Sequence, residues 1–241
     1  MYKTTQRTQE RKDVRRRTIL NAAADVFSTN GYHDATVKEI VERADVSVGT
    51  FYFYFKSKED LFKELYESIA EEFRERTMSV VDVARFSMLK NYTRVMAATL
   101  WMYEQKRAIA GIMLRETASV PCLQALEAAR MRAFTDTMAA WFKRFRSHEG
   151  VAIPDERIAA RIYAGSYNGL VGAWLASEPD APLTDCAFAF CVYHLQALRI
   201  PFAEDEVRGY IAQVLAELHA AEGGAPQSAG STTHANGREN G

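Results

Sequence analysis

Five basic residues near the start of the chain form the first group whose type and spacing suggest chemistry. They are Arg11, Lys12, Arg15, Arg16 and Arg17. They precede the first helical periodicity, where guanidinium and ammonium groups can pair with phosphates. Residues 1–58 hold eleven Lys and Arg against seven Asp and Glu, a net charge of +4, whereas the remainder carries −5. The pattern predicts a nucleic-acid contact or, alternatively, a solvated helix face.

A second group combines two thiols with an imidazole near the carboxyl end. Of Cys186, Cys191 and His194, only Cys191 and His194 share a helix face, so buried thiols and a packed imidazole are favoured over a metal site. The sequence contains no Gly-x-Ser-x-Gly elbow, phosphate-cradling loop, His-Glu-x-x-His pair, dinucleotide fingerprint or Cys-x-x-Cys pair. We therefore predict no catalytic residue, no metal, no cofactor and no enzymatic activity.

Composition and length predict an ordinary globular protein. The chain has 241 residues, 48% of them hydrophobic, which is enough to bury a sizeable core. No apolar stretch is long enough to cross a bilayer, and no apolar run follows a charged amino-terminal segment, so we expect a cytoplasmic protein without a membrane partner. The three cysteines, Cys122, Cys186 and Cys191, are too few for a disulfide framework and fit a reducing compartment.

Apolar residues recur at helical spacing along nearly the whole chain, without sustained two-residue alternation, so the predicted fold class is all-α. The expected helices cover residues 12–29, 37–44, 48–54, 58–78, 85–104, 107–116, 120–147, 155–176, 184–198 and 204–221. Thr36 with Glu39 predicts a capping box, and Ser47 and Ser57 are further helix caps. From residue 222 onward, small and polar residues predict a disordered tail.

An ordered series of residues runs through the first four of these helices. Its members are Ile19-Leu20, Ala22-Ala23, Phe27, Gly31-Tyr32, Thr36-Val37, Glu39-Ile40, Val46-Ser47-Val48-Gly49-Thr50-Phe51-Tyr52, Tyr54-Phe55, Ser57-Lys58-Glu59 and Leu61. This series resembles the DNA-binding domain of the tetracycline-repressor (TetR) family of bacterial regulators. The resemblance implies a three-helix helix-turn-helix domain, followed by a helical bundle that binds a small-molecule effector and forms a homodimer.

The resemblance also implies which residues meet double-stranded DNA. Val46, Phe51 and Phe55 should face inward, which leaves the other face of the third helix for the major groove. The expected DNA-binding residues are Thr36, Lys38, Val48, Gly49, Thr50, Tyr52, Phe53, Tyr54 and Lys58. Among them, Gly49 would permit close backbone approach, and Lys58 would pair with a phosphate. The alternative for the tyrosines is simple packing in the core.

Two departures from the family pattern have physical consequences. Asp45 stands where the family usually has glycine in the turn. Asp is one of the few residues that can adopt the left-handed conformation, so the turn should form at some energetic cost. The third helix contains no cation, which suggests apolar contacts with thymine methyl groups rather than arginine–guanine pairs.

Large side chains in the carboxyl-terminal half suggest either an apolar effector cavity or an ordinary core. They are Trp101, Tyr103, Met113, Phe134, Met138, Trp141, Phe142, Tyr163, Tyr167 and Trp174. A cavity so lined would suit a lipophilic or aromatic effector, and Arg115 is the candidate partner for an anionic head group. The narrower set of expected ligand-binding residues is Trp101, Met113, Arg115, Phe134, Trp141, Tyr167 and Trp174.

Small residues recur at spacings of three and four in the helix 155–176. A partner helix can approach such a ridge closely, and the resemblance implies that this helix and the next form the dimer interface. The expected interface residues are Ala164, Asn168 and Gly172. The alternative is close packing against the helix 120–147 of the same chain.

Together these patterns predict a one-component transcription regulator. The expected domains are a basic arm over 1–17, a helix-turn-helix domain over 18–65, a ligand-binding and dimerisation domain over 66–221 and a disordered tail over 222–241. Repression of a palindromic operator, relieved by the effector, is the family's usual outcome. The alternatives are activation, or a helical interaction protein that has lost DNA binding.

Overall fold

The computed structural model describes residues 6–82, 84, 87–116, 120–149, 153–177 and 181–223. In these residues the fold is helical throughout, which confirms the predicted all-α class. The helices are α1 (Gln6–Asp34), α2 (Val37–Arg43), α3 (Val48–Tyr54), α4 (Lys58–Ser79), α5 (Met88–Gln105), α6 (Arg107–Glu116), α7 (Pro121–Glu149), α8 (Glu156–Ser177), the 3-10 helix η1 (Leu183–Cys186), α9 (Ala187–Ala197) and α10 (Glu204–Gly223).

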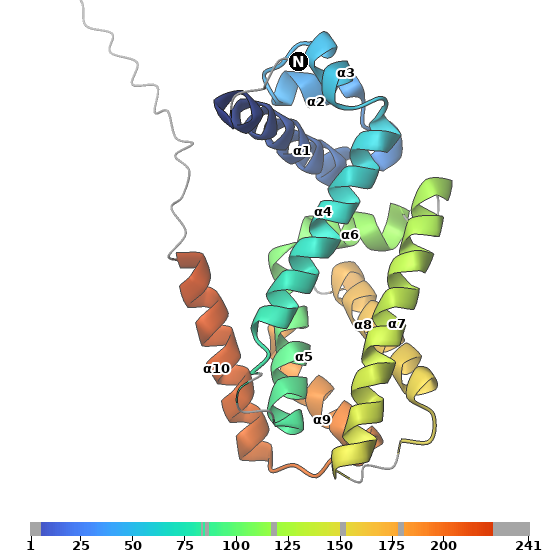
Figure 1. The fold of residues 1–241 in the computed structure, drawn as a ribbon, viewed down its shortest axis with the longest axis vertical. Coiled ribbons are helices and arrows are strands. Elements are labelled where there is room, and N and C mark those ends of the chain that lie inside the picture. The colour runs from blue at the N-terminus through green and yellow to red at the C-terminus, as the bar shows by residue number, and fades with distance from the viewer. Residues whose placement is uncertain are drawn as a thin grey trace, which may run out of the picture.

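Figure 1 shows two layers joined by one long helix. Helices α1, α2 and α3 gather at the top, and α4 runs from them down into a bundle formed by α5, α7, α8, α9 and α10. Helix α6 crosses the middle and packs against α1. Because α4 belongs to both layers, a change in the lower bundle has a direct mechanical route to α1–α3.

Most helix ends coincide with the local signals in the sequence. One exception is α5, which begins at Met88 after a Ser87 cap and not near residue 85. Gly31 ends the regular part of α1 with φ 76°, a conformation that glycine adopts without steric cost. However, α1 begins at Gln6 and not near residue 12, because residues 6–11 contain no helix breaker. The expected helix 184–198 is divided into η1 and α9, and its first turn is the tighter 3-10 form.

The buried side chains form two cores. The N-terminal core comprises side chains of α1–α4 such as Ile19, Phe27 and Phe51, and it also includes Ile112 of α6 and Leu123 of α7. The C-terminal core lies among α5, α7, α8, α9 and α10. Helix α6 and the start of α7 therefore contribute to the N-terminal core. They do so although they come after α5, which belongs to the C-terminal core, in the sequence.

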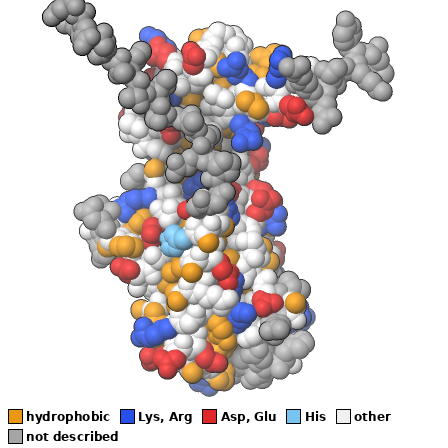
Figure 2. Space-filling model, turned by 90° about the vertical axis from the view of Figure 1, so that its left-hand side faces the viewer, with side chains coloured by type: hydrophobic (Ala, Val, Ile, Leu, Met, Phe, Trp, Pro, Cys, Tyr) orange, Lys and Arg blue, Asp and Glu red, His pale blue; other side chains and the backbone are white. Residues whose placement is uncertain are grey.

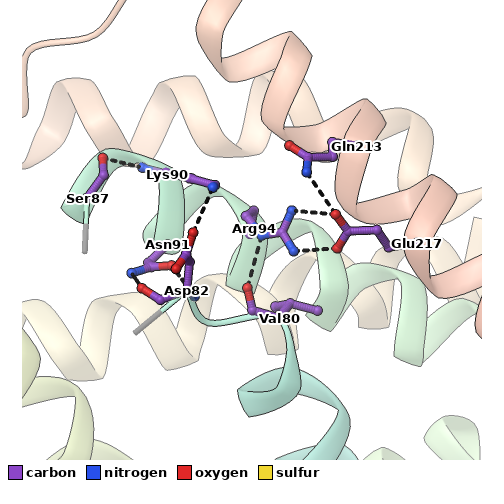
Figure 3. A network of polar contacts seen from close by, with 8 residues as sticks. All are labelled: Val80, Asp82, Ser87, Lys90, Asn91, Arg94, Gln213 and Glu217. Carbon is purple, nitrogen blue, oxygen red and sulfur yellow. Dashed lines mark hydrogen bonds and ion pairs between the residues drawn. The ribbon is translucent and has the colours of Figure 1, made fainter. Parts of the chain in front are cut away.

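A buried arginine fixes the end of α4 to α5 and α10 (Figure 3). Arg94 of α5 is 6% exposed, and its Nε donates to the carbonyl oxygen of Val80 at 2.9 Å. Its terminal nitrogens donate to both carboxylate oxygens of Glu217 on α10, and this hydrogen bonding lowers the pKa of Glu217. Asn91 of α5 exchanges hydrogen bonds with the backbone of Asp82. The lower end of α4 is therefore anchored.

Charged side chains of both signs are intermingled with hydrophobic ones on the face drawn in Figure 2. No helix among the described residues is long and apolar enough to span a membrane.

Candidate nucleic-acid interface

The start of α2 is held by a reciprocal capping box. The Thr36 hydroxyl oxygen accepts from the Glu39 backbone N–H at 3.2 Å, and a carboxylate oxygen of Glu39 accepts from the Thr36 backbone N–H at 2.8 Å. Hydrogen bonding from the Thr36 hydroxyl lowers the pKa of Glu39. The backbone of Thr36 is thereby fixed. Lys38 is exposed and forms only a loose 3.8 Å ion pair with Glu42, so its ammonium group is accessible.

The turn between α2 and α3 contains a residue in the left-handed region. Asp45 has φ 51°, the conformation expected of it from the sequence. The next residue, Val46, donates its backbone N–H to the carbonyl oxygen of Val41 at 3.0 Å, which closes the turn. Ser47 then caps α3, accepting from the Thr50 backbone N–H at 3.1 Å. These contacts fix the angle between α2 and α3.

Helix α3 separates an inward from an outward face. Phe51 and Phe55 are 0% and 1% exposed, as the sequence predicted, and Val46 is half-buried. On the outward face, Val48, Tyr52 and Phe53 are 50%, 56% and 66% exposed. Such large exposed side chains on a rigid helix are typical of a contact surface.

The remaining residues expected on the α3 surface lie between these faces. Gly49 is exposed, and a Cβ added there would meet only the Ser47 Oγ, at 3.8 Å. Thr50 is half-buried with its hydroxyl 2.9 Å from that of Ser47. Tyr54 is half-buried and packs against the N-terminal core. Folding alone therefore does not require glycine at position 49.

We expected the ammonium group of Lys58 to contact a DNA phosphate, but in this structure it binds backbone carbonyl oxygens. Nζ donates to the carbonyl oxygens of Tyr32 (2.6 Å), Ala35 (2.7 Å) and His33 (3.2 Å), which uses all three of its hydrogens. It also lies 4.5 Å from the centroid of the Tyr32 ring, and burial lowers its pKa. In this structure Lys58 ties the start of α4 to the end of α1. A phosphate contact would require exchange of these bonds and stays a prediction.

The first turns of α1 lie beside the outward face of α3. Nζ of Lys12 is 5.5 Å from the centroid of the Phe53 ring. Arg16 has a different environment, because it pairs with Glu64 of α4 and lies over the Phe55 ring. The sequence did not predict this contact between α1 and α3. The only signal for it was that Lys12 belongs to the group of basic residues near the start of the chain.

The expected ligand-binding residues do not converge on one place. Trp101 is buried and donates to His219 Nε2 at 3.3 Å, whereas Trp174 donates to the Ala181 carbonyl at 2.6 Å. Trp141 is half-buried against the C-terminal core. Met113 packs against the N-terminal core, which separates it from the others. Arg115 lies in α6, with its side chain outside the part of the structure that is described.

Tyr167 and Phe134, by contrast, belong to one buried group around Tyr163. The Tyr163 and Tyr167 hydroxyls are 3.2 Å apart, and Tyr167 donates to the carbonyl of Met96 at 3.1 Å. The Phe134 ring stacks on that of Tyr163 with centroids 6.0 Å apart. Burial raises the pKa of both tyrosines, so they are neutral at physiological pH.

Sequence reasoning missed the polar neighbours of this group. The Ser166 hydroxyl lies 2.9 Å from Nε2 of His194, and Tyr163 contacts both His194 and Tyr92. The i, i+4 spacing of Tyr163 and Tyr167 predicts that the two tyrosines lie on one face of α8. It does not predict the contact with His194, because this residue comes from α9. We call the group formed by Tyr92, Phe134, Tyr163, Ser166, Tyr167 and His194 the tyrosine cluster. The described residues contain no group of three or more His, Cys, Asp or Glu that would hold a metal.

The small-residue ridge of α8 is divided between the inside and the surface. Ala164 is 6% exposed within a single protomer, so it offers a partner almost no surface, and Asn168 and Gly172 are half-buried. One side of α8 packs closely against α7, with an Arg157–Asp136 ion pair at 2.7 Å. The exposed side of α8 is a stripe of residues that lies about one position further along the helix than the expected interface residues. Its residues are Ile158, Ile162, Gly165, Gly169 and Ala173.

Comparison with known proteins agrees with this geometry. Residues 19–65 match the family model described as bacterial regulatory proteins, tetR family. The uncharacterized HTH-type transcriptional regulator YdgC of Bacillus subtilis is 44% identical over 66 residues, 27% of this chain and 34% of that protein. The fatty acid metabolism regulator protein of Bacillus subtilis is 43% identical over 58 residues, 24% of this chain and 30% of that protein. The alignments thus span about a third of each relative.

The fold similarity extends further than the sequence similarity. The transcriptional regulator FadR from Bacillus subtilis, solved in complex with stearoyl-CoA, superposes with a TM-score of 0.67 at 20% identity, covering 74% of this chain and 96% of that chain. At such identity the likeness concerns the fold alone, and with 74% of this chain covered it extends well beyond residues 19–65. Residues 19–65 thus match the DNA-binding domain of the tetR family, and the chain as a whole has a fold similar to that of FadR.

Proposed function

We propose that this protein is a transcription regulator that binds double-stranded DNA as a homodimer, represses its target and is released by a small lipophilic effector. The observation that carries the proposal is the outward face of α3, where Val48, Tyr52 and Phe53 are held exposed by a capped helix and a closed turn. A helix of this size fits the major groove, where its side chains would reach base edges. A protein that binds chromosomal DNA would act in the cytoplasm, which is the compartment we propose.

The proposed dimer rests on the exposed stripe of α8 and its continuation on α9. Ile162 is 60% exposed and Tyr193 of α9 is 65% exposed. Large apolar side chains beside exposed glycines allow two helices to approach closely and bury both surfaces. Two α3 helices related by a two-fold axis would read a palindromic operator. We propose this stripe in place of Ala164 as the centre of the interface.

The proposed effector site is the tyrosine cluster. Its lining is mostly aromatic, and its hydroxyl and imidazole groups supply a few hydrogen-bonding positions, which suits a largely apolar ligand with one polar group. FadR from Bacillus subtilis, with the same fold, is known in complex with stearoyl-CoA. An effector that stabilises a bundle geometry incompatible with operator spacing would empty the operator. Phe73 of α4 contacts Tyr103, whose ring lies 6.5 Å from that of Tyr167, and so offers a route to α4.

The test is selection of DNA from a random pool, followed by gel shift of the enriched sequence. We expect a palindromic sequence, bound by the wild type and lost by Tyr52→Ala, whose side chain is exposed and whose removal leaves the thermal unfolding curve unchanged. Met78→Ala, a truncation of a 41% exposed residue at the far end of α4, is the control and should bind normally. Failure to enrich any sequence at low salt would favour the rival, an interaction protein that no longer binds DNA.

The enriched sequence also tests how α3 reads DNA. Because α3 has no basic residue, we expect thymines at the positions it covers. G-rich positions there would contradict apolar readout. Repression and activation are separated by placing the operator upstream of a reporter gene, where loss of the protein raises expression in the first case and lowers it in the second.

A further inference from the structure

The first turns of α1 lie outside the family match and carry unpaired cations. The match begins at residue 19, whereas α1 begins at Gln6. Arg11 and Arg15 are exposed, and among the described residues neither takes part in an ion pair. They lie four residues apart on one helix, so their guanidinium groups share a face. The family match assigns no role to this face.

A hollow of about 1210 Å³ separates this face of α1 from α3. Its lining from α1 is Thr8, Glu10, Arg11, Lys12, Val14, Arg15 and Thr18, and its lining from the α3 side is Ser47, Gly49, Thr50, Phe53 and Tyr54. The lining therefore contains three cations and one carboxylate, all from α1, together with hydroxyl and aromatic groups. Arg16 and Arg17 are not part of the lining, and Arg16 is already paired with Glu64.

The two walls of the hollow are in contact. Lys12 lies over the Phe53 ring, which is the most exposed aromatic side chain of α3. The contact shows that the extension of α1 lies next to the face that we propose enters the major groove. A DNA strand bordering that groove would therefore pass beside Arg11 and Arg15. The occupant that fits is a polyanion with sugar rings, because cations and hydroxyl groups alternate with the apolar surfaces of Val14 and Phe53.

We propose that this hollow binds the sugar-phosphate backbone of the DNA strand next to the major groove. Arg11 and Arg15 contact phosphates, Lys12 adds a third charge, and Val14 faces deoxyribose. The inference rests on the proposed function and adds to it a binding surface that the family match does not include. Its role is to position α3 on the duplex independently of sequence, since backbone contacts hold orientation and base contacts select sequence.

The test is a salt titration of DNA affinity for the double variant Arg11→Ala/Arg15→Ala. Each lost phosphate contact lowers the slope of log K against log salt by about 0.9, and the dimer loses four contacts, so we expect a decrease of about 3.6 in the magnitude of the slope. The affinity for the selected operator and for unrelated duplex should fall by the same factor, on the order of a hundredfold at moderate salt. The double variant should still enrich the wild-type sequence from a random pool.

Arg17→Ala is the matched control, because it removes an exposed charge from the same helix outside the hollow. A double variant with the slope and affinity of Arg17→Ala would overturn the inference while leaving the proposed function intact. A loss confined to one DNA sequence would also overturn it, because it would indicate base contact. If the wild type binds no duplex at low salt, the proposed function and this inference fail together. Helix content by circular dichroism confirms that the variants fold.

Discussion

Lys58 shows how one side chain can match a binding motif and still have a structural task. Its ammonium group bridges three carbonyl oxygens near the end of α1. Residues 32–35 connect α1 to α2, so this bridge positions the whole helix-turn-helix relative to α4.

We predict that Lys58→Met lowers the free energy of unfolding by about 2 kcal/mol, because it leaves half-buried carbonyls without a donor. Urea denaturation measures the change. Lys63→Met, at an exposed position on the same helix, is the control and should change stability little. A Lys58→Met protein with wild-type stability but weakened DNA affinity would instead support the phosphate contact.

His194 makes stability depend on pH. Its ring is 4% exposed, and burial lowers its pKa to about 4 from an ordinary value of 6.5. The folded state therefore resists protonation between these values, whereas the unfolded state accepts the proton. Stability from the neutral ring is present above pH 6.5 and is lost as the pH falls toward 4.

We predict that this residue alone removes about 3 kcal/mol from the free energy of unfolding between pH 6.5 and 4. The measurement is denaturant unfolding at a series of pH values. His194→Gln should flatten the curve over that interval, and His33→Gln, at an exposed position, should not. Identical slopes for the wild type and His194→Gln would show that other groups cause the acid sensitivity.

At the scale of elements, the connection between α2 and α3 carries a conformational cost. Asp45 is exposed and has φ 51°, a region in which any residue with a Cβ is disfavoured. The hydrogen bond from Val46 to Val41 holds the turn closed against that cost.

Asp45→Gly should raise the free energy of unfolding by roughly 0.5 kcal/mol, since the relief of the left-handed conformation exceeds the added freedom of the unfolded chain. Asp45→Val should lower it by more, because a β-branched residue tolerates this region poorly. In thermal unfolding, the midpoint temperature of Asp45→Gly should lie above that of the wild type, and the midpoint of Asp45→Val should lie below it. A higher midpoint for Asp45→Val than for the wild type would contradict our claim that the backbone is strained at this position.

At the scale of the whole molecule, α8 has an apolar stripe that no described part of the same protomer covers. Ile158 and Ile162 are 48% and 60% exposed on a helix whose other side is packed against α7. Next to these isoleucines are glycines at which an added Cβ would meet no atom of another described part of the chain within 4 Å, so a second copy of α8 has room to approach.

We predict that the wild type sediments as a dimer and that Ile162→Glu sediments as a monomer at micromolar concentration, because the charge cannot be buried at a two-fold axis. Ala216→Glu adds the same charge at an exposed position on α10 and should remain dimeric. The monomeric variant should bind the operator at least tenfold more weakly, since only one α3 is engaged. A dimeric Ile162→Glu protein would move the interface elsewhere.

Local chemistry determined much of the fold from the sequence alone. The caps at Thr36, Ser47 and Ser57 and the apolar spacing predicted the bounds of α2, α3 and α4 to within about one residue, because these signals act within a single helical turn. The inward placement of Phe51 and Phe55 and the conformation of Asp45 were predicted for the same reason.

Only the tertiary structure decided which side chains meet across the fold. The partners of Lys58 lie more than twenty positions away, His194 comes from α9 to join Ser166 of α8, and Met113 packs with the N-terminal core. Helical periodicity gives the face on which Ala164 lies but not the helix that covers it. The hollow between α1 and α3 likewise depends on the angle between two helices, which is set by packing of the whole N-terminal core.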